Sequence, residues 1–242
     1  MRFDQRRVRW VELSFAMLML LLPASAANRG AAGRPPTVDQ VLSHMHQSSL
    51  KLNTIEAKIV QEVRHTDIGG HEIYQGELYF EHSKTDKLRV KYWTDGKVSQ
   101  DVLVTGEQIS LYQPIAKQVL QTTKRAQAAK DQEFDFITTP YSSVSSLKSR
   151  YRIDYPTDED KIAPTAKSVD GVATVILTLA PRKPGSVKRV VLSINPNSWV
   201  PVRYEVEDEN KVISFTLTNV KLGQKKLPGE CWNQKIAKVP TE

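Results

Sequence analysis

The chain contains few of the residue types from which chemical sites are built. Its 242 residues include one cysteine, Cys231, and five histidines. A single cysteine excludes an internal disulfide. A reactive thiol would need a His or Lys beside it, and we therefore interpret Cys231 as a small buried apolar residue.

Catalytic motifs are absent as well. No serine occupies a nucleophile elbow, and no glycine-rich loop leads from a strand into a helix. His65 and His71 flank a predicted turn and could approach a metal with Glu62 or Glu72, but no ligand spacing recurs elsewhere, which favours solvent-facing hairpin residues. We expect no catalytic, cofactor-binding or metal-binding residues, and no enzymatic activity.

The charge pattern does not predict a nucleic-acid partner. Lys and Arg number 34 against 27 Asp and Glu, a formal charge of +7. These charges are dispersed, without a Lys/Arg run and without interleaved aromatic residues. We interpret them as a solvated surface and expect no nucleic acid to bind.

Long apolar runs are missing except at the N-terminus. Leu13–Leu22 is apolar but too short to span a bilayer. Four arginines precede it, and Pro23 and the small residues 24–26 follow it, which predicts a signal peptide over residues 1–26 with cleavage after Ala26. The pair Arg6-Arg7 leaves twin-arginine export open beside the general secretory route, which we favour. With no cysteine near the cleavage site to carry a lipid, we expect a soluble periplasmic protein.

Residues 27–36 are expected to form a flexible leader, and residues 37–242 a single domain. Thr37 and Gln40 form a capping-box pattern. The apolar residues that follow recur at helical spacing and predict a helix over residues 38–50. The segment 124–150 predicts one or two short helices, and 156–171 a solvated polar loop.

After Asn53, apolar and polar residues alternate with a period of two. Gly76, inside the second predicted strand, indicates a bulge or a close approach of backbone. Short strands joined by near-neighbour turns predict one antiparallel sheet of about eleven strands, rolled toward a barrel. The predicted strands cover 55–63, 73–81, 87–93, 98–104, 108–113, 118–122, 151–155, 174–179, 187–194, 200–207 and 211–220, with a last one near 231–236.

Four stretches together resemble the LolA-type periplasmic carriers of outer-membrane lipoproteins. They are Ile55-x-Ala57-x-Ile59-x-Gln61, Gly76-x-Leu78-x-Phe80, Leu88–Tyr92 and residues 102–119. The resemblance implies a mainly β fold, a half-open antiparallel barrel of about eleven strands with a few helices as a lid over an apolar cavity. It also implies a monomer that takes acylated lipoproteins from an inner-membrane ABC transporter to an outer-membrane receptor.

In this reading the inner face of the sheet lines the cavity. Members of the family often carry an Arg-Pro pair after the second strand, whose Arg closes the lid. His82-Ser83 stands there in this chain, so His82 is the candidate closing contact, with Lys84 and Lys87 as alternatives. A carrier of another lipid or glycolipid and an envelope lipid-sensing module are the alternatives. The predicted cavity residues are Ile55, Ala57, Ile59, Leu78, Phe80, Leu88, Val90, Tyr92, Leu103, Ile109 and Leu111, with Leu42, Met45, Val144 and Leu147 in the lid; which of Ile109 and Leu111 points inward stays open.

Overall fold

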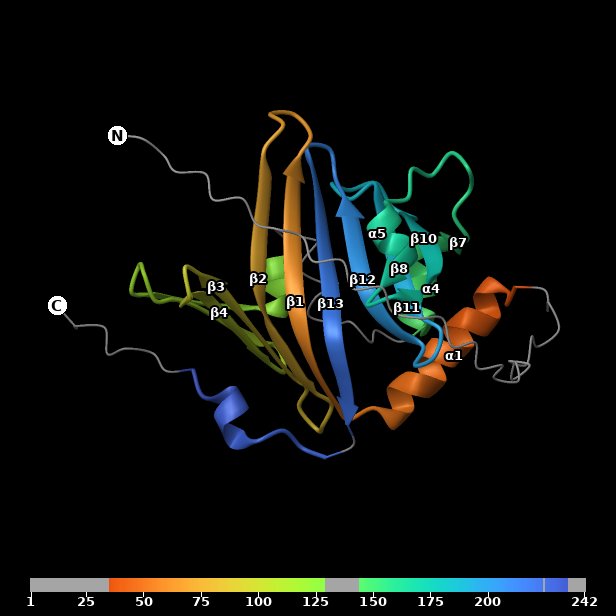
Figure 1. Ribbon diagram of the computed structural model, residues 1–242. Coiled ribbons are helices and arrows are strands. Elements are labelled where there is room, and N and C mark those ends of the chain that lie inside the picture. Colours follow the sequence, from red (N-terminus) through yellow and green to blue (C-terminus); the bar gives the residue numbers. More distant parts are fainter. Residues whose placement is uncertain (1–34, 129–143, 224, 235–242) are drawn as a thin grey trace, which may run out of the picture. The chain divides into compact units, whose positions relative to one another are not determined.

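The computed structural model describes residues 35–128, 144–223 and 225–234 (Figure 1). The chain divides into two units, Met1–Pro35 and Pro36–Glu242, and the following description concerns the second. The predicted signal peptide and nearly all of the leader lie outside the described residues. So does the middle of the predicted helical segment 124–150.

Helix α1 (Val38–Lys51) begins where the sequence predicts it to begin. The N–H of Thr37 donates to Oε1 of Gln40 at 2.7 Å, and the N–H of Gln40 donates to Oγ1 of Thr37 at 3.3 Å. These two bonds satisfy donors that a helix N-terminus otherwise leaves unpaired, so the predicted capping box is confirmed.

Eleven strands form one antiparallel sheet in the order β6-β5-β4-β3-β2-β1-β13-β12-β11-β10-β7. The edge strands β6 and β7 do not pair with each other, so the sheet is open, and the predicted mainly β, half-open architecture is confirmed. Figure 1 shows the long strands β2, β1 and β13 side by side in its middle. The strands are β1 (Thr54–His65), β2 (His71–Glu81), β3 (Lys87–Thr94), β4 (Lys97–Thr105), β5 (Gln108–Gln113), β6 (Gln118–Thr123), β7 (Tyr151–Asp154), β10 (Val175–Pro181), β11 (Arg189–Asn195), β12 (Val200–Glu207) and β13 (Lys211–Gly223).

The strand register places the alternating apolar residues on one side of the sheet. Ile55 pairs with Phe80, Phe80 with Leu88, and Leu88 with Val104. On the other half of the sheet, Leu179, Val190, Val206 and Ile213 follow one another across four strands in the same way. Directly paired residues point to the same side, so one apolar face runs across the sheet. We call this side the inner face and the opposite side the outer face.

Two described helices pack against the inner face. Val41 and Leu42 of α1 and Leu147 of α4 (Val144–Arg150) belong to the same buried cluster as the apolar residues of the strands. Lys148 Nζ of α4 lies 2.7 Å from an Asp39 carboxylate oxygen of α1, which links the two helices. The predicted helical segment also forms α2 (Lys124–Ala128).

The polar segment 156–171 is structured, and the prediction of a solvated loop there is wrong in part. It contains α5 (Pro164–Lys167) and strand β8 (Ser168–Val169), which pairs with β9 (Val172–Ala173). Ala166 and Val169 are buried, while α5 contacts β10 and β11, and β8 contacts β13. Apolar residues in this segment recur at about every third position, which is not the pattern of a strand. A strand of two residues is also too short to show alternation.

The predicted strand near 231–236 is also wrong in its described part. Gly229–Trp232 forms a short 3-10 helix, η1, within the segment that follows β13. We call Lys225–Gln234 the C-terminal strap. Its contacts with the sheet use side chains of β2–β5, among them Leu227 N–H donating to the Glu81 carboxylate at 3.0 Å, instead of a backbone ladder.

Gly76 provides a test of the central packing, and the prediction of a close backbone approach there is confirmed. A Cβ added at this position would lie 2.1 Å from the backbone oxygen of Lys91 on β3. Because backbone cannot move aside cheaply, Gly76→Ala should lower the free energy of unfolding by about 1–3 kcal/mol or more in urea titrations.

Gly229→Ala is the matched control for that substitution. An added Cβ at Gly229 meets no atom within 4 Å, and its effect should stay within about 0.5 kcal/mol. Equal stabilities of the two variants would contradict the packing of β2 on β3.

Candidate functional site

The inner face is the candidate site, and most of the residues predicted for it lie there. The register and burial place them in one cluster that extends over β1, β2, β3 and β5. The predicted residues in this cluster are Ile55, Ala57, Ile59, Leu78, Phe80, Leu88, Val90, Tyr92 and Ile109.

Leu103 was assigned to the wrong face. It pairs with Arg89 on β3 and with Ser110 on β5, both of which lie on the outer face. Its neighbours Val102 and Val104 face inward instead and join the core cluster. All three residues of the run Val102-Leu103-Val104 are apolar, so alternation alone could not show which of them face inward. The pairing of Val104 with Leu88 shows it.

The open question about β5 has a clear answer. Ile109 pairs with Val104, and Leu111 pairs with Val102, so both face inward. Ile109 is buried, while Leu111 is half-buried. On the edge strand β6, Leu120 pairs with Leu111 and is 54% exposed. The inner face is therefore progressively less covered toward the β6 edge.

The residues predicted for the lid also pack against this face. Leu42 and Leu147 are buried in the core cluster, and Met45 and Val144 are partly buried against it. His82 lies in the turn between β2 and β3, where its Nδ1 is 2.8 Å from the carboxylate of Asp86. This side-chain contact of His82 lies within its own turn, while its backbone N–H donates to the backbone oxygen of Asn53 at 2.6 Å. A lid-closing role stays a prediction.

Sequence reasoning missed the half of the inner face that β10–β13 provide. Leu177, Leu192, Tyr204 and Phe215 pair in turn across these strands, and Phe215 pairs with Gln61 of β1. The alternation of Val175, Leu177 and Leu179 on β10 is the signal that could have found them. Val202, Tyr204 and Val206 on β12 show the same alternation, although both faces of that strand are buried.

Two tyrosines place polar groups on this apolar face. Burial raises the pKa of Tyr92 and of Tyr204 well above the usual value for a phenol. The hydroxyl of Tyr204 is buried and has no hydrogen-bond partner among the described residues. Such a neutral hydroxyl can donate or accept a hydrogen bond with a polar group.

The chemistry of the described residues agrees with binding more than with catalysis. They contain no group of three His, Cys, Asp or Glu side chains able to hold a metal ion. Nε2 of His65 lies 3.7 Å from the Glu72 carboxylate, across the first hairpin. Cys231 is half-buried in the strap, and burial raises the pKa of its thiol. Among the described residues, no helix is long and apolar enough to cross a membrane.

Tyr204 yields a prediction about stability and pH. Its folded pKa lies above the unfolded value, so the stability due to the neutral phenol is complete below about pH 10 and is lost as the pH rises further. Tyr204→Phe should keep or raise the free energy of unfolding at neutral pH, by up to about 1 kcal/mol, because an unpaired buried hydroxyl is removed. It should also flatten the alkaline decline, measured by urea titration at several pH values.

Tyr79→Phe is the control for the hydroxyl. The Tyr79 hydroxyl donates to Glu77 at 2.7 Å, so its removal should cost about 0.5–1.5 kcal/mol. If Tyr204→Phe destabilises the protein as much as Tyr79→Phe does, the Tyr204 hydroxyl has a partner in solution.

Comparison with solved structures agrees with the architecture described above. MucB matches with a TM-score of 0.50 and 16% identity over 81% of this chain and 62% of its own. A DUF1329 family protein from Desulfovibrio piger matches with a TM-score of 0.45 and 12% identity, over 81% and 99% of the two chains. The lipoprotein LppX from Mycobacterium tuberculosis matches with a TM-score of 0.45 and 10% identity, over 76% and 96%. At these identities the likeness concerns the fold alone.

Comparison by sequence gives a narrower result. No curated protein matches the chain. The family model described as "Outer membrane lipoprotein carrier protein LolA" matches residues 50–228, from the end of α1 to the beginning of the strap. This range contains all eleven strands of the sheet and with them the whole inner face. The protein therefore belongs to the LolA family of lipoprotein carriers.

Proposed function

We propose that this protein is a periplasmic carrier that shelters the acyl chains of lipoproteins against the inner face and moves them from the inner to the outer membrane. The observation that carries the proposal is the apolar face itself. It continues from β5 through β1 to β10, and its covering includes α1 and the short helix α4. Family membership supports a carrier over an enzyme.

The physical need for such a face follows from the cost of exposing acyl chains. Each CH₂ transferred to water costs about 0.8 kcal/mol, so one chain of roughly sixteen carbons costs on the order of 13 kcal/mol. Unaided diffusion of a diacylated or triacylated protein through water would be negligible at that cost. A protein that buries the chains against its own apolar face removes most of it.

Release requires that the cover can move. Leu147 and Val144 are the described apolar contacts of α4 with the core, and the described link from α4 to α1 is one exposed ion pair, Lys148–Asp39. Exposed ion pairs contribute about 1 kcal/mol or less. The C-terminal end of α4 is also held by Arg182, whose Nε donates to the backbone oxygen of Lys148 at 2.9 Å. Displacing a helix of seven residues suits a carrier that must hand its cargo on.

Export and transfer partners complete the proposal. A signal peptide over residues 1–26, cleaved after Ala26, would deliver a soluble single domain to the periplasm. There an inner-membrane ABC transporter would load the cargo and an outer-membrane receptor would accept it. Transfer would follow an affinity gradient, with no bond formed or broken.

Bound material identifies the cargo. The protein should be purified from its native envelope without detergent and analysed by native mass spectrometry. We expect a fraction of molecules to carry a diacylated or triacylated protein. A small lipid in its place would support carriage of another lipid. If the protein purified from the envelope carries no ligand and also fails to bind a fluorescent fatty acid, both carrier proposals are contradicted.

A substitution on each face tests where acyl chains bind. Leu111 is half-buried on the inner face, and Leu103 is half-buried on the outer face of the adjacent strand. A carboxylate in an apolar binding site costs several kcal/mol. Leu111→Glu should therefore weaken binding of dansyl-undecanoic acid at least about tenfold, while Leu103→Glu should bind as the unmodified protein does.

The choice of Leu111 keeps this experiment interpretable. Leu88 is 2% exposed, so a glutamate there would unfold the sheet and would not report on binding. Circular dichroism and urea titration establish that both variants are folded. Equal binding by the two variants, or loss in Leu103→Glu alone, would contradict the assignment of the site to the inner face.

A further inference from the structure

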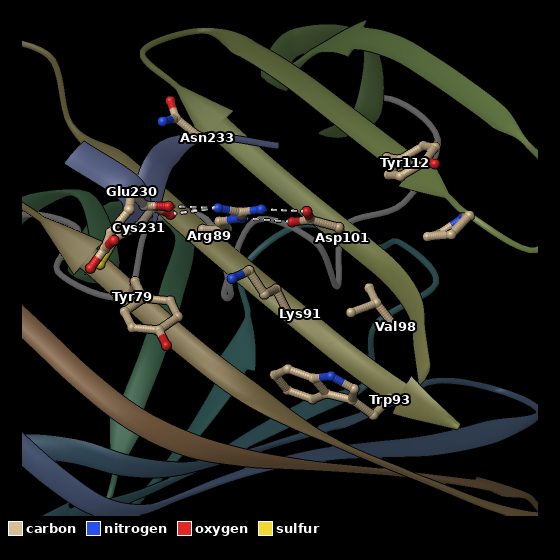
Figure 2. A pocket seen from close by; sticks show the side chains of 11 residues that line it. Tyr79, Arg89, Lys91, Trp93, Val98, Asp101, Tyr112, Glu230, Cys231 and Asn233 are labelled. Carbon is tan, nitrogen blue, oxygen red and sulfur yellow. Dashed lines mark hydrogen bonds and ion pairs between the residues drawn. The ribbon is translucent and has the colours of Figure 1, made fainter. Parts of the chain in front are cut away.

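A second cavity lies on the outer face, on the other side of the sheet from the proposed cargo site (Figure 2). Its volume of about 540 Å³ lies within the range of roughly 300–1,000 Å³ typical of small-molecule sites. Strands β2–β4 provide Tyr79, Arg89, Lys91, Trp93, Val98 and Asp101, and β5 with the residue after it provides Tyr112 and Pro114. The family comparison assigns nothing to this cavity.

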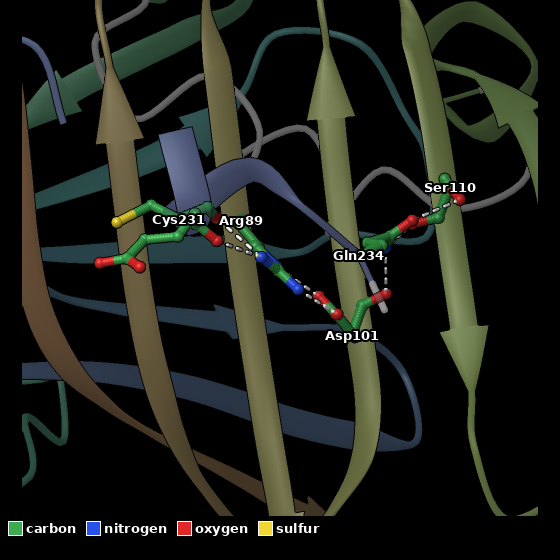
Figure 3. A network of polar contacts seen from close by, with 6 residues as sticks. Arg89, Asp101, Ser110, Cys231 and Gln234 are labelled. Atoms are coloured by element: carbon green, nitrogen blue, oxygen red, sulfur yellow. Dashed lines mark hydrogen bonds and ion pairs between the residues drawn. The ribbon is translucent and has the colours of Figure 1, made fainter. Parts of the chain in front are cut away.

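The C-terminal strap builds one wall of the cavity. Glu230, Cys231 and Asn233 of the strap line it. Arg89 fixes that wall, because its Nη1 donates to the backbone oxygen of Cys231 at 2.8 Å (Figure 3). Further along, Gln234 Nε2 donates to the backbone oxygen of Asp101 at 2.8 Å. These contacts give the cavity a defined wall on its strap side.

The base of the cavity is a buried ion pair whose charges cancel. Arg89 Nε and Nη2 donate to the two carboxylate oxygens of Asp101 at 2.8 and 2.6 Å, and both side chains are at most 6% exposed. A bidentate pair of this kind satisfies both partners. Arg89 is therefore part of the wall and is not a free cation for a ligand.

Lys91 is the cation that remains. Its strand neighbours are Glu77 and Asp101; Arg89 neutralises Asp101, whereas Glu77 accepts the Tyr79 hydroxyl and keeps its negative charge. The contact described for the Lys91 ammonium is with the ring of Tyr79, 5.6 Å from its centre. Figure 2 shows Lys91 in the middle of the lining, with the exposed Glu230 at the edge beside Cys231.

Beside these charged groups, the lining near Lys91 contains flat, uncharged side chains. Tyr79 and Trp93 lie on strands β2 and β3 beside Lys91, and Tyr112 faces them from β5. The thiol of Cys231 is neutral, because burial raises its pKa. An aromatic body can pack on such side chains while a negative group reaches the ammonium.

We infer that the outer cavity, completed by the C-terminal strap, is a second binding site, whose ligand is a small aromatic anion with its carboxylate or sulfonate on Lys91 and its ring among Tyr79, Trp93 and Tyr112. This site is separate from the inner face and does not depend on the proposed lipid cargo. Because the strap provides part of its wall, a ligand bound here also stabilises the docked strap.

Calorimetric titration with naphthoate tests the charge requirement, with naphthalene methanol as the uncharged analogue. The unmodified protein should bind naphthoate saturably at one site. Lys91→Gln should weaken naphthoate about tenfold, the effect of losing one hydrogen bond to a charged group, and should leave the uncharged analogue unchanged. Lys183→Gln, which removes an exposed lysine in the turn after β10, does not touch the cavity lining and should have no effect.

The single cysteine provides an independent readout. Cys231 lines the cavity, so bound naphthoate should slow its reaction with a thiol reagent severalfold in the unmodified protein. At the same naphthoate concentration, Lys91→Gln should show much less protection. Protection that is equal in both proteins would place the anion elsewhere.

Binding to the inner face would give a different pattern. Leu111→Glu should leave naphthoate binding intact while it weakens binding of the fatty-acid probe. The outer site would be overturned if Leu111→Glu lost naphthoate binding while Lys91→Gln kept it. The absence of any naphthoate binding by the unmodified protein would overturn it as well. If the fatty-acid probe fails to bind but naphthoate shows the Lys91 dependence, the carrier proposal falls and the outer site stands.

Discussion

The structure depends on one constraint: an open sheet of eleven strands has to bury an apolar face that it cannot close on itself. The apolar face of β1, with Ile55, Ala57 and Ile59, continues over both halves of the sheet. On one half it includes Leu88 and Val104, and on the other Phe215 and Leu192. A closed barrel would fill its interior with these side chains. Here β6 and β7 remain unpaired with each other, and helices α1 and α4 contribute to the cover instead.

The outer face is covered in two separate ways. Over β10, β11 and β13 the segment with α5, β8 and β9 packs on the sheet, and the pair Arg203–Glu205 is buried with its charged atoms 3.0 Å apart. Over β2–β5 the C-terminal strap docks through Arg89 and Gln234. Buried charges are tolerated only with partners. Arg203 and Glu205 are paired within the sheet, whereas Arg89 also binds the strap through the backbone oxygen of Cys231. The cavity beside the strap is the part of the outer face that neither segment fills.

The sequence predicts the sheet well because local pattern and tertiary structure agree there. Alternation in β1 and β3 and the capping box at Thr37 require no knowledge of distant contacts, and Gly76 signalled a close approach that the backbone of Lys91 explains. Prediction fails where a decision depends on pairing. Leu103 lies in a run that is apolar in both phases, and its face is set by the register of β3 on β4.

Other features were beyond a local reading for similar reasons. The strap is held by side chains far away in the sequence, such as Arg89, which lies 142 positions before Cys231. Its Pro228 and Gly229 lead into a 3-10 helix and not into a strand. The residues of β12 do alternate between apolar and polar, and both sides of the strand are buried. The cavity residues were predicted on the N-terminal half of the sheet, where the family resemblance was drawn, and not on the C-terminal half.

The most direct test of the central claim is to locate a bound acyl chain on the sheet by magnetic resonance. A spin-labelled stearate broadens the methyl signals of side chains close to it. The account predicts broadening of Val104, Ile109 and Leu192 on the inner face, with the Leu103 methyl signals left sharp on the outer face. Broadening of Leu103 without the inner-face methyl groups would contradict it, as would a stearate that leaves every signal unchanged.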